Sequence, residues 1–217
     1  MVIADHQTKG RGRSNRDWVT KPGSALAISI ILLPTKQERK FFHYLTALGA
    51  IAVGDALIKH FNFQVEIKWP NDVLIQRKKV CGILTENSWS GDQIEAVVIG
   101  IGINVACSSV PPRNSLAFPG TSIEHELGRA VNRMEVLQMV INSFFDWRKS
   151  IARPEFFDFW QEHLAYRGEP VRIIEDGKTV AAGRLLGLSR SGELELLSEN
   201  DAKITVMTGD LHLRPIG

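Results

Sequence analysis

The sequence has little cysteine, no excess of charge of either sign and no apolar leader. Only two of its 217 residues are cysteines, Cys81 and Cys107, which is too few for the disulfide framework of a small secreted protein. Lysines and arginines number 26 against 24 acidic residues, so no global field draws the chain toward nucleic acid or a membrane. Residues 1–7 lack the features of a signal peptide, and no apolar stretch is expected to reach the roughly 20 residues that span a bilayer. We therefore expect a cytoplasmic protein without a membrane segment, whose anion binding must come from a local cluster.

Several common site motifs are also absent. The sequence has no Gly-x-x-x-x-Gly-Lys-Ser/Thr phosphate loop and no Gly-x-Gly-x-x-Gly after a strand. It has no His-Glu-x-x-His and no Cys/His spacing typical of a metal site. His125 and His163 stand alone, and we interpret each as structural or exposed.

Hydrophobic periodicity indicates an α+β first part. A buried strand is predicted over residues 24–33, and a capping box at Thr35 precedes a helix predicted over residues 36–60. Further strands are predicted over residues 65–68, 73–75, 80–86 and 94–105, and further helices over 132–151 and 154–164. We expect a mixed or antiparallel sheet with helices covering one face.

The composition changes near Tyr166. From Gly168 onward, short alternating runs are broken by turns, which is typical of a small β-barrel. We predict two domains, residues 1–166 and residues 167–217.

The first cluster with chemical potential is a basic, glycine-rich loop near the N-terminus. Glycines let backbone amides approach an anion, arginines offer forked donors to phosphate or carboxylate, and a tryptophan can stack on a ring. The alternatives are a solvated basic loop and an RNA-binding segment. The candidate binding residues of this loop are Gln7, Gly10, Arg11, Gly12, Arg13, Arg16 and Trp18.

Three further clusters follow along the chain. Lys68-Trp69-Pro70-Asn71-Asp72 forms a turn that could present Asn71 and Asp72 into a cleft, or simply a turn with Trp69 covering the core. Lys79 leads into an apolar strand in which Gly82 leaves room beside it; the alternative is a solvated hairpin lysine. Asn104 ends a run with two glycines, Gly100-Ile101-Gly102-Ile103-Asn104, which permits close backbone approach or simply a core strand. Cys81 is interpreted as a packing residue.

The order of these clusters resembles that of the biotin protein ligases. The resemblance covers residues 2–164, and the tail is similar in kind to the family's SH3-like barrel. It rests on four segments in this order: Gln-x-x-Gly-Arg-Gly-Arg-x-x-Arg-x-Trp at residues 7–18, Lys-Trp-Pro-Asn-Asp at 68–72, Lys-x-x-Gly-Ile-Leu-x-Glu at 79–86 and Gly-Ile-Gly-Ile-Asn at 100–104.

The resemblance implies a two-step reaction. Biotin's carboxylate attacks the α-phosphate of ATP, with Mg²⁺ screening the triphosphate, to give biotinyl-5'-AMP, and a lysine of a biotin carboxyl carrier protein then takes the biotin. It implies that Arg13 and Arg16 lie against phosphates and that Lys79 bridges the biotin carboxylate and the α-phosphate. Asp72 would orient the attacking amine. Gln7, Gly10, Arg11, Gly12, Trp18, Gly82 and Asn104 would line the biotin or adenylate pocket.

The sequence departs from the family's pattern at its front. The Ser-Thr-Asn segment that forms one wall of the family's biotin site does not precede the basic loop, so we expect weak biotin binding by this chain alone. We also expect an exposed sheet edge at residues 2–4 that invites pairing with another chain, such as a homodimer. No helix-turn-helix is recognised, and we expect no sequence-specific DNA binding. The alternatives to a biotin ligase are a lipoate-type ligase and a non-catalytic nucleic-acid binder.

Overall fold

A computed structural model describes residues 1–13, 16–116, 118–175, 177–207 and 212–216. Ser14 and Asn15 of the predicted basic loop lie outside these residues. The strands are β1 (Val2–Ala4), β2 (Ala25–Leu32), β3 (Val65–Lys68), β4 (Asp72–Ile75), β5 (Lys78–Ser90), β6 (Gln93–Asn104), β7 (Pro170–Glu175), β8 (Lys178–Leu188), β9 (Leu194–Leu197), β10 (Lys203–Val206) and β11 (His212–Pro215). The helices are η1 (Glu38–Tyr44), α1 (Leu45–Phe61), η2 (Cys107–Ser109), η3 (Arg113–Ser115), α2 (Ile123–Leu127), α3 (Arg133–Lys149) and α4 (Pro154–Glu162), where η denotes a 3₁₀ helix.

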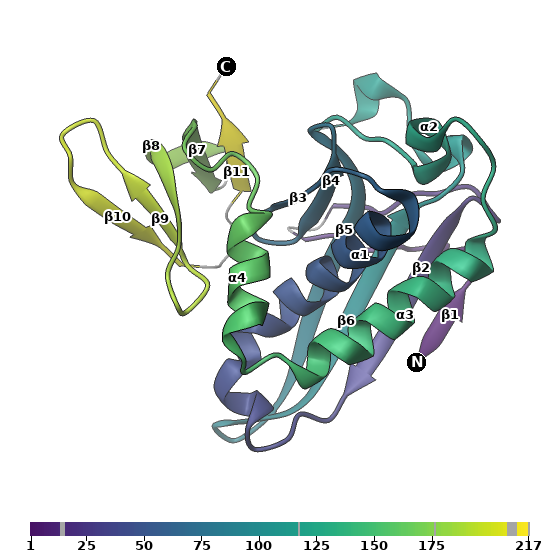
Figure 1. Cartoon of the computed structure of the whole chain (residues 1–217), viewed down its shortest axis with the longest axis horizontal. Coiled ribbons are helices and arrows are strands. Elements are labelled where there is room, and N and C mark those ends of the chain that lie inside the picture. Colours follow the sequence, from purple (N-terminus) through teal and green to yellow (C-terminus); the bar gives the residue numbers. More distant parts are fainter. Residues whose placement is uncertain (14–15, 117, 176, 208–211, 217) are drawn as a thin grey trace.

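The first six strands form one antiparallel sheet in the order β1-β2-β6-β5-β4-β3. Alternate residues of β2 and β6 point to one face, where Ile28 and Ile30 pair across the strands with Ile101 and Ile99, and all four are buried. Helices α1 and α3 cover this face (Figure 1). The prediction of an α+β fold with an antiparallel sheet and helices on one face is therefore confirmed.

The capping box at Thr35 is present, although the helix that follows it begins differently from the prediction. The Glu38 amide donates to the Thr35 hydroxyl, and the Thr35 amide donates to the Glu38 carboxylate. The first turns are 3₁₀, and Phe41 has a non-helical backbone before α1 starts at Leu45. The combined segment Glu38–Phe61 is long and apolar enough to cross a membrane by length and composition, so the expectation that no stretch reaches this length is wrong. Since 72% of its most apolar window is buried within the fold, it is the central helix of the core.

The last five strands form a second antiparallel sheet, in the order β10-β9-β8-β7-β11. The β8–β9 turn of this sheet contacts the first part of the chain. The Trp69 indole N–H donates to the Gly192 carbonyl at 3.1 Å, and the Tyr44 hydroxyl donates to the Arg190 carbonyl at 2.6 Å. Helix α4 stands between the two sheets (Figure 1). These contacts hold the second sheet beside the Lys-Trp-Pro-Asn-Asp turn.

Strand β1 forms the outer edge of the first sheet, as predicted. It pairs with β2 on one side only, and Val2 and Ile3 remain exposed.

Candidate active site

A cavity of about 650 Å³ opens where the basic loop, the β3–β4 turn, the start of β5 and the last strand meet. Its size is typical of a pocket for a small organic ligand. Five cationic and two acidic side chains line it, which makes it a local basic site in a chain of nearly balanced charge. These are Arg13, Arg16, Lys68, Lys79 and Arg214, with Asp17 and Asp72.

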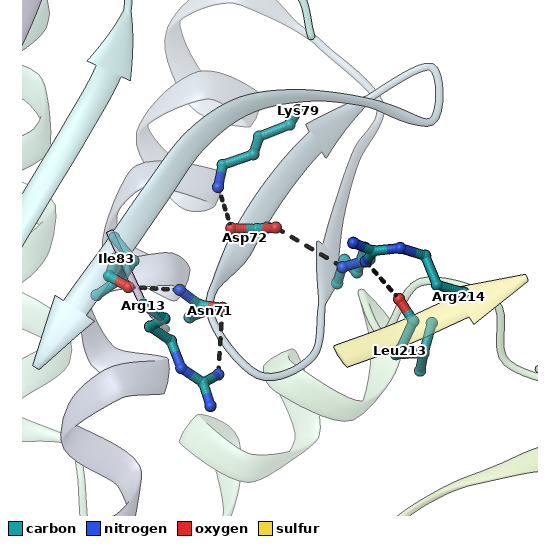
Figure 2. A network of polar contacts seen from close by, with 8 residues as sticks. Arg13, Asn71, Asp72, Lys79, Ile83, Leu213 and Arg214 are labelled. Atoms are coloured by element: carbon teal, nitrogen blue, oxygen red, sulfur yellow. Dashed lines mark hydrogen bonds and ion pairs between the residues drawn. The ribbon is translucent and has the colours of Figure 1, made fainter. Parts of the chain in front are cut away.

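Asp72 lies between two lysines in this cavity. Its side chain is 12% exposed, with Oδ1 at 2.6 Å from Lys79 Nζ and Oδ2 at 3.7 Å from Lys68 Nζ. Burial alone would raise the pKa of Asp72, but Lys79 and then Lys68 hold it below its usual value. Asp72 is therefore ionised at neutral pH, and Figure 2 shows it facing Lys79, which comes from β5.

Lys68 is the most deeply buried cation of the site, with 4% of its side chain exposed. Burial lowers its pKa from 10.5 to about 8; Asp72 opposes this shift, whereas Arg214, Lys79 and Arg16 add to it. Burial, reinforced by Arg16, likewise lowers the pKa of Arg214. The cations thus repel one another, and a bound anion would relieve this repulsion.

Asn71 connects the β3–β4 turn to the basic loop. Its Nδ2 donates to the Ile83 carbonyl at 2.6 Å, and its Oδ1 lies 3.5 Å from Arg13 Nη1 (Figure 2). Asn71 is therefore fixed by β5 and available to orient Arg13. Sequence reasoning placed Asn71 in the cleft but gave it no role.

The basic loop folds back on itself through backbone hydrogen bonds. The Gly12 amide donates to the Arg16 carbonyl at 2.6 Å, and the Trp18 amide donates to the Gly10 carbonyl at 2.9 Å. A Cβ on Gly10 would lie 2.3 Å from the Trp18 carbonyl oxygen, so this close approach requires glycine.

The Trp18 ring rests on a floor of two glycines that pair across β5 and β6, Gly82 and Gly102. A Cβ on Gly102 would lie 2.6 Å from Trp18 Cε2, and one on Gly82 would lie 2.9 Å from Lys79 Nζ. The Trp18 indole N–H is buried and has no hydrogen-bond acceptor among the described residues. A buried donor of this kind favours a ligand that supplies an acceptor.

Another part of the cavity wall is apolar and comes from the segment between β6 and α2. It contains Val110, Pro111, Pro112, Leu116 and Phe118. Lys68 Nζ and the Arg214 guanidinium lie 5.0 and 5.8 Å from the centre of the Phe118 ring. Asn104, 6% exposed, donates from Nδ2 to the Thr121 carbonyl at 3.0 Å, so it holds this wall in addition to lining the cavity.

Seven of the residues predicted from the sequence meet at this cavity, and an eighth, Gly82, forms the floor below Trp18. The seven are Gly12, Arg13, Arg16, Trp18, Asp72, Lys79 and Asn104. Gln7, Gly10 and Arg11 do not line it; Arg11 forms an exposed ion pair with Glu86 at 3.0 Å.

Sequence reasoning missed Arg214 and the burial of Lys68. The burial of Lys68 could have been suspected from the sequence, because this lysine stands between an alternating apolar strand and Trp69. No signal existed for Arg214, because it comes from the second sheet.

Cys81 is fully buried, and burial raises the pKa of its thiol, which agrees with a packing role. Among the described residues, no group of three or more His, Cys, Asp or Glu side chains is arranged to hold a metal ion.

Comparison with known proteins identifies this arrangement. Residues 1–104 match the Biotin/lipoate A/B protein ligase family. The biotin–[acetyl-CoA-carboxylase] ligase of Paracoccus denitrificans is 35% identical over 90% of this chain and 82% of its own length. The bifunctional ligase/repressor BirA of Bacillus subtilis is 33% identical over 98% of this chain, which spans 66% of that relative's length.

Solved structures agree with these relatives. The biotin protein ligase of Aquifex aeolicus in complex with biotin and ATP superposes with a TM-score of 0.84 and 31% identity, over 99% of this chain and 88% of that one. The chain therefore belongs to the biotin protein ligase family.

Proposed function

We propose that this chain activates biotin with ATP to biotinyl-5'-AMP and transfers the biotin to a lysine of a biotin carboxyl carrier protein. The observation that carries the proposal is the convergence of five cations on one cavity, where Lys79 and Asp72 of the lining are in contact with each other. The names of the relatives, biotin ligases from Paracoccus denitrificans and Aquifex aeolicus, support biotin over lipoate.

In the first step, an oxygen of the biotin carboxylate attacks the α-phosphorus of ATP and pyrophosphate leaves. The two anions must be drawn together, and charge moves to the leaving group. We assign Lys79 to the carboxylate and α-phosphate, and Arg13 and Arg16 to the phosphates. Arg214, which reaches the same cavity from β11, would add a further cation (Figure 2).

In the second step, the carrier lysine attacks the mixed anhydride and AMP leaves. The attacking amine must lose its proton and be aimed at the carbonyl carbon. Asp72 is the carboxylate of the cavity that is held ionised by its neighbours, and we assign it this orienting role.

Trp18 and the remaining loop residues would enclose the intermediate. An acyl-adenylate hydrolyses readily, so water must be excluded until the carrier docks. We assign Gly12, Trp18, Gly82 and Asn104 to the walls of the biotin and adenylate pocket, whereas Gln7, Gly10 and Arg11, which do not line the cavity, belong to the loop that carries Gly12 and Trp18. The Trp18 indole N–H, which has no acceptor among the described residues, and the apolar wall that contains Phe118 support an enclosed ligand with a ring system.

Mg²⁺ would enter with the triphosphate as MgATP. The described residues offer no ready-made carboxylate cluster for it, so the phosphates would carry most of its coordination.

Several further assignments remain proposals. We propose a domain boundary near Tyr166, an SH3-like barrel over residues 167–217 and a cytoplasmic location, as for a soluble bacterial-type ligase. Pairing into a homodimer and the expected lack of sequence-specific DNA binding stay predictions.

Calorimetric titration with biotin, with and without MgATP, tests the function. Binding of biotin that tightens with MgATP, together with biotin-dependent exchange of pyrophosphate into ATP, would support the proposal. Lipoate binding under the same conditions without biotin binding would replace biotin by lipoate. Binding of single-stranded RNA at low salt without either acid would favour a nucleic-acid binder.

A further inference from the structure

Glu126 lies behind the cavity, on helix α2. Its side chain is only 4% exposed, although the helix is at the surface. Lys78 Nζ donates to Glu126 Oε1 at 2.5 Å, and the Thr121 hydroxyl donates to the same oxygen. A buried carboxylate with two donors on one oxygen fixes both donors in place.

The two donors flank Lys79. Lys78 is its neighbour along β5, with its side chain directed to the opposite face of the strand. Lys79 pairs with Gly120 in an isolated parallel bridge, in which the Thr121 amide donates to the Lys79 carbonyl at 2.9 Å and the Lys79 amide donates to the Pro119 carbonyl at 2.7 Å. The backbone of Lys79 is thus held between Pro119 and Thr121, whose side chain Glu126 fixes.

The same contacts reach the apolar wall. Asn104 donates to the Thr121 carbonyl, so the end of the wall segment is held by β6, by β5 and by Glu126 together. A shift of Thr121 would therefore move Lys79 and the wall at once. Burial alone would raise the pKa of Glu126, but the contacts with Lys78 and Thr121 outweigh this effect and hold the pKa below its usual value. Glu126 therefore stays charged at neutral pH.

We propose that Glu126 is a positioning residue that holds Lys79 in register with Asp72 and the cavity. Its catalytic consequence rests on the proposed function, whereas its effect on the placement of Lys79 does not. Glu126 itself does not line the cavity. A displacement of about 1 Å in a reacting group can lower a rate about 100-fold, so a support of this kind has a measurable effect on activity.

Selective acetylation of lysines tests the placement without any substrate. The full chain is treated with a limiting amount of N-hydroxysuccinimidyl acetate, and the rate of Lys79 modification is followed by peptide mass spectrometry. In Glu126→Ala we expect Lys79 to react about fivefold faster, the factor equivalent to about 1 kcal/mol of lost charge-assisted contact with Asp72. In Glu126→Gln, whose amide oxygen can still accept from Thr121 and Lys78, the increase should be smaller.

Glu124→Ala is the matched control. Glu124 lies on the same helix, but its carboxylate accepts from the Val131 amide at 3.2 Å rather than from residues beside Lys79. The proposal is overturned if the Lys79 rate in Glu126→Ala equals that in Glu124→Ala. If Glu126→Ala does not fold, Glu126→Gln is compared with the same control, and equal rates again overturn it.

Pyrophosphate exchange then separates this inference from the proposed function. We expect Glu126→Ala to lower kcat at least about tenfold with a smaller change in the KM for biotin, and Glu126→Gln to recover part of kcat. No biotin-dependent exchange by the unmodified chain would count against the proposed function and leave the labelling result to decide the positioning role. Normal exchange by Glu126→Ala would overturn the positioning role alone.

Discussion

Replacing Asp72 by asparagine preserves the shape of the side chain and removes the negative charge between Lys68 and Lys79. Lys79 is 28% exposed and can turn toward solvent, whereas Lys68 is 4% exposed and cannot. The free-energy cost of the substitution should therefore come mainly from Lys68, which has the option of losing its proton.

The size of this cost follows from the pKa of Lys68. The gap between the ordinary value of 10.5 and the folded value of about 8 means that the fold carries the charged lysine at a cost of about 3 kcal/mol at pH 7. Holding Lys68 fully neutral at pH 7 would cost about 5 kcal/mol, so its contribution to the loss of stability in Asp72→Asn is limited to between about 1 and 2 kcal/mol. The same reasoning gives a limit of about 3 kcal/mol at pH 6 and of less than about 1 kcal/mol at pH 8.

The loss of stability in Asp72→Asn should shrink as the pH rises, whereas the loss on removing an ordinary ion-paired carboxylate grows as the pH rises. Asp72 raises the pKa of Lys68 against the effect of burial, so its loss lowers that pKa further. The folded parent therefore binds more protons than the folded variant near neutral pH, and raising the pH stabilises the variant relative to the parent. Asp72 does not titrate in this range, since its own pKa is held below its usual value.

Urea unfolding of the parent chain and of Asp72→Asn at pH 6, 7 and 8 measures this difference, with Asp72→Glu as the charge-preserving control. The difference in the free energy of unfolding should shrink steadily as the pH rises. A difference that is constant or grows from pH 6 to 8 would refute the argument that Lys68 limits the cost.

Three other substitutions test separate parts of the site. Gly102→Ala should displace the Trp18 ring and weaken biotin binding in calorimetry. The control Gly100→Ala, whose Cβ would come no closer than 3.4 Å to the Leu84 carbonyl oxygen, should leave the affinity unchanged. Equal affinities of the two variants would argue against a place for Trp18 in the biotin pocket. Lys79→Met should lower biotin-dependent pyrophosphate exchange about 100-fold or more, while the exposed Lys178→Met leaves it unchanged; an active Lys79→Met would contradict the first-step assignment. Trp69→Phe should destabilise the chain by about 2 kcal/mol or more in urea, because it leaves the Gly192 carbonyl unpaired, whereas Trp89→Phe at a 53% exposed position should change stability by less than about 0.5 kcal/mol; similar losses would argue against the Trp69 contact.

Much of the first sheet could be predicted because its signals are local. The alternating and continuous apolar runs of β2 and β6 follow from burial on one or both faces of the sheet. The capping box is a four-residue sequence pattern, Thr35 to Glu38, and can be recognised without the fold. Helix α2 was not predicted, since five residues are too few to show a helical period. The 3₁₀ turns before α1 were not predicted either; Tyr44, which ends them, packs against Phe156 and Trp160, a tertiary contact that no local pattern reveals.

The site divides in the same way. Arg13, Lys79 and Asp72 lie in recognisable segments, so their residue types and order pointed to them. Glu126 and Arg214 acquire their positions only through tertiary packing, because one lies on a short helix behind β5 and the other on the last strand. The two alternatives for the segment from Lys68 to Asp72, a cleft-lining turn and a turn with its tryptophan in the core, are both correct. Asn71 and Asp72 line the cavity, and Trp69 is fully buried in the core.

The contact of Trp69 with Gly192 has a consequence for how the protein unfolds. The β3–β4 turn carries both Asp72, which lines the cavity, and Trp69, whose indole N–H binds the Gly192 carbonyl of the second sheet. Detachment of that sheet would expose the largest fully buried side chain of the core and withdraw Arg214 from the cavity. We therefore expect the amide hydrogens of the turns that join the two sheets to exchange together, as one cooperative unit. If the second sheet detaches, the cavity should be the first part of the molecule to lose its structure.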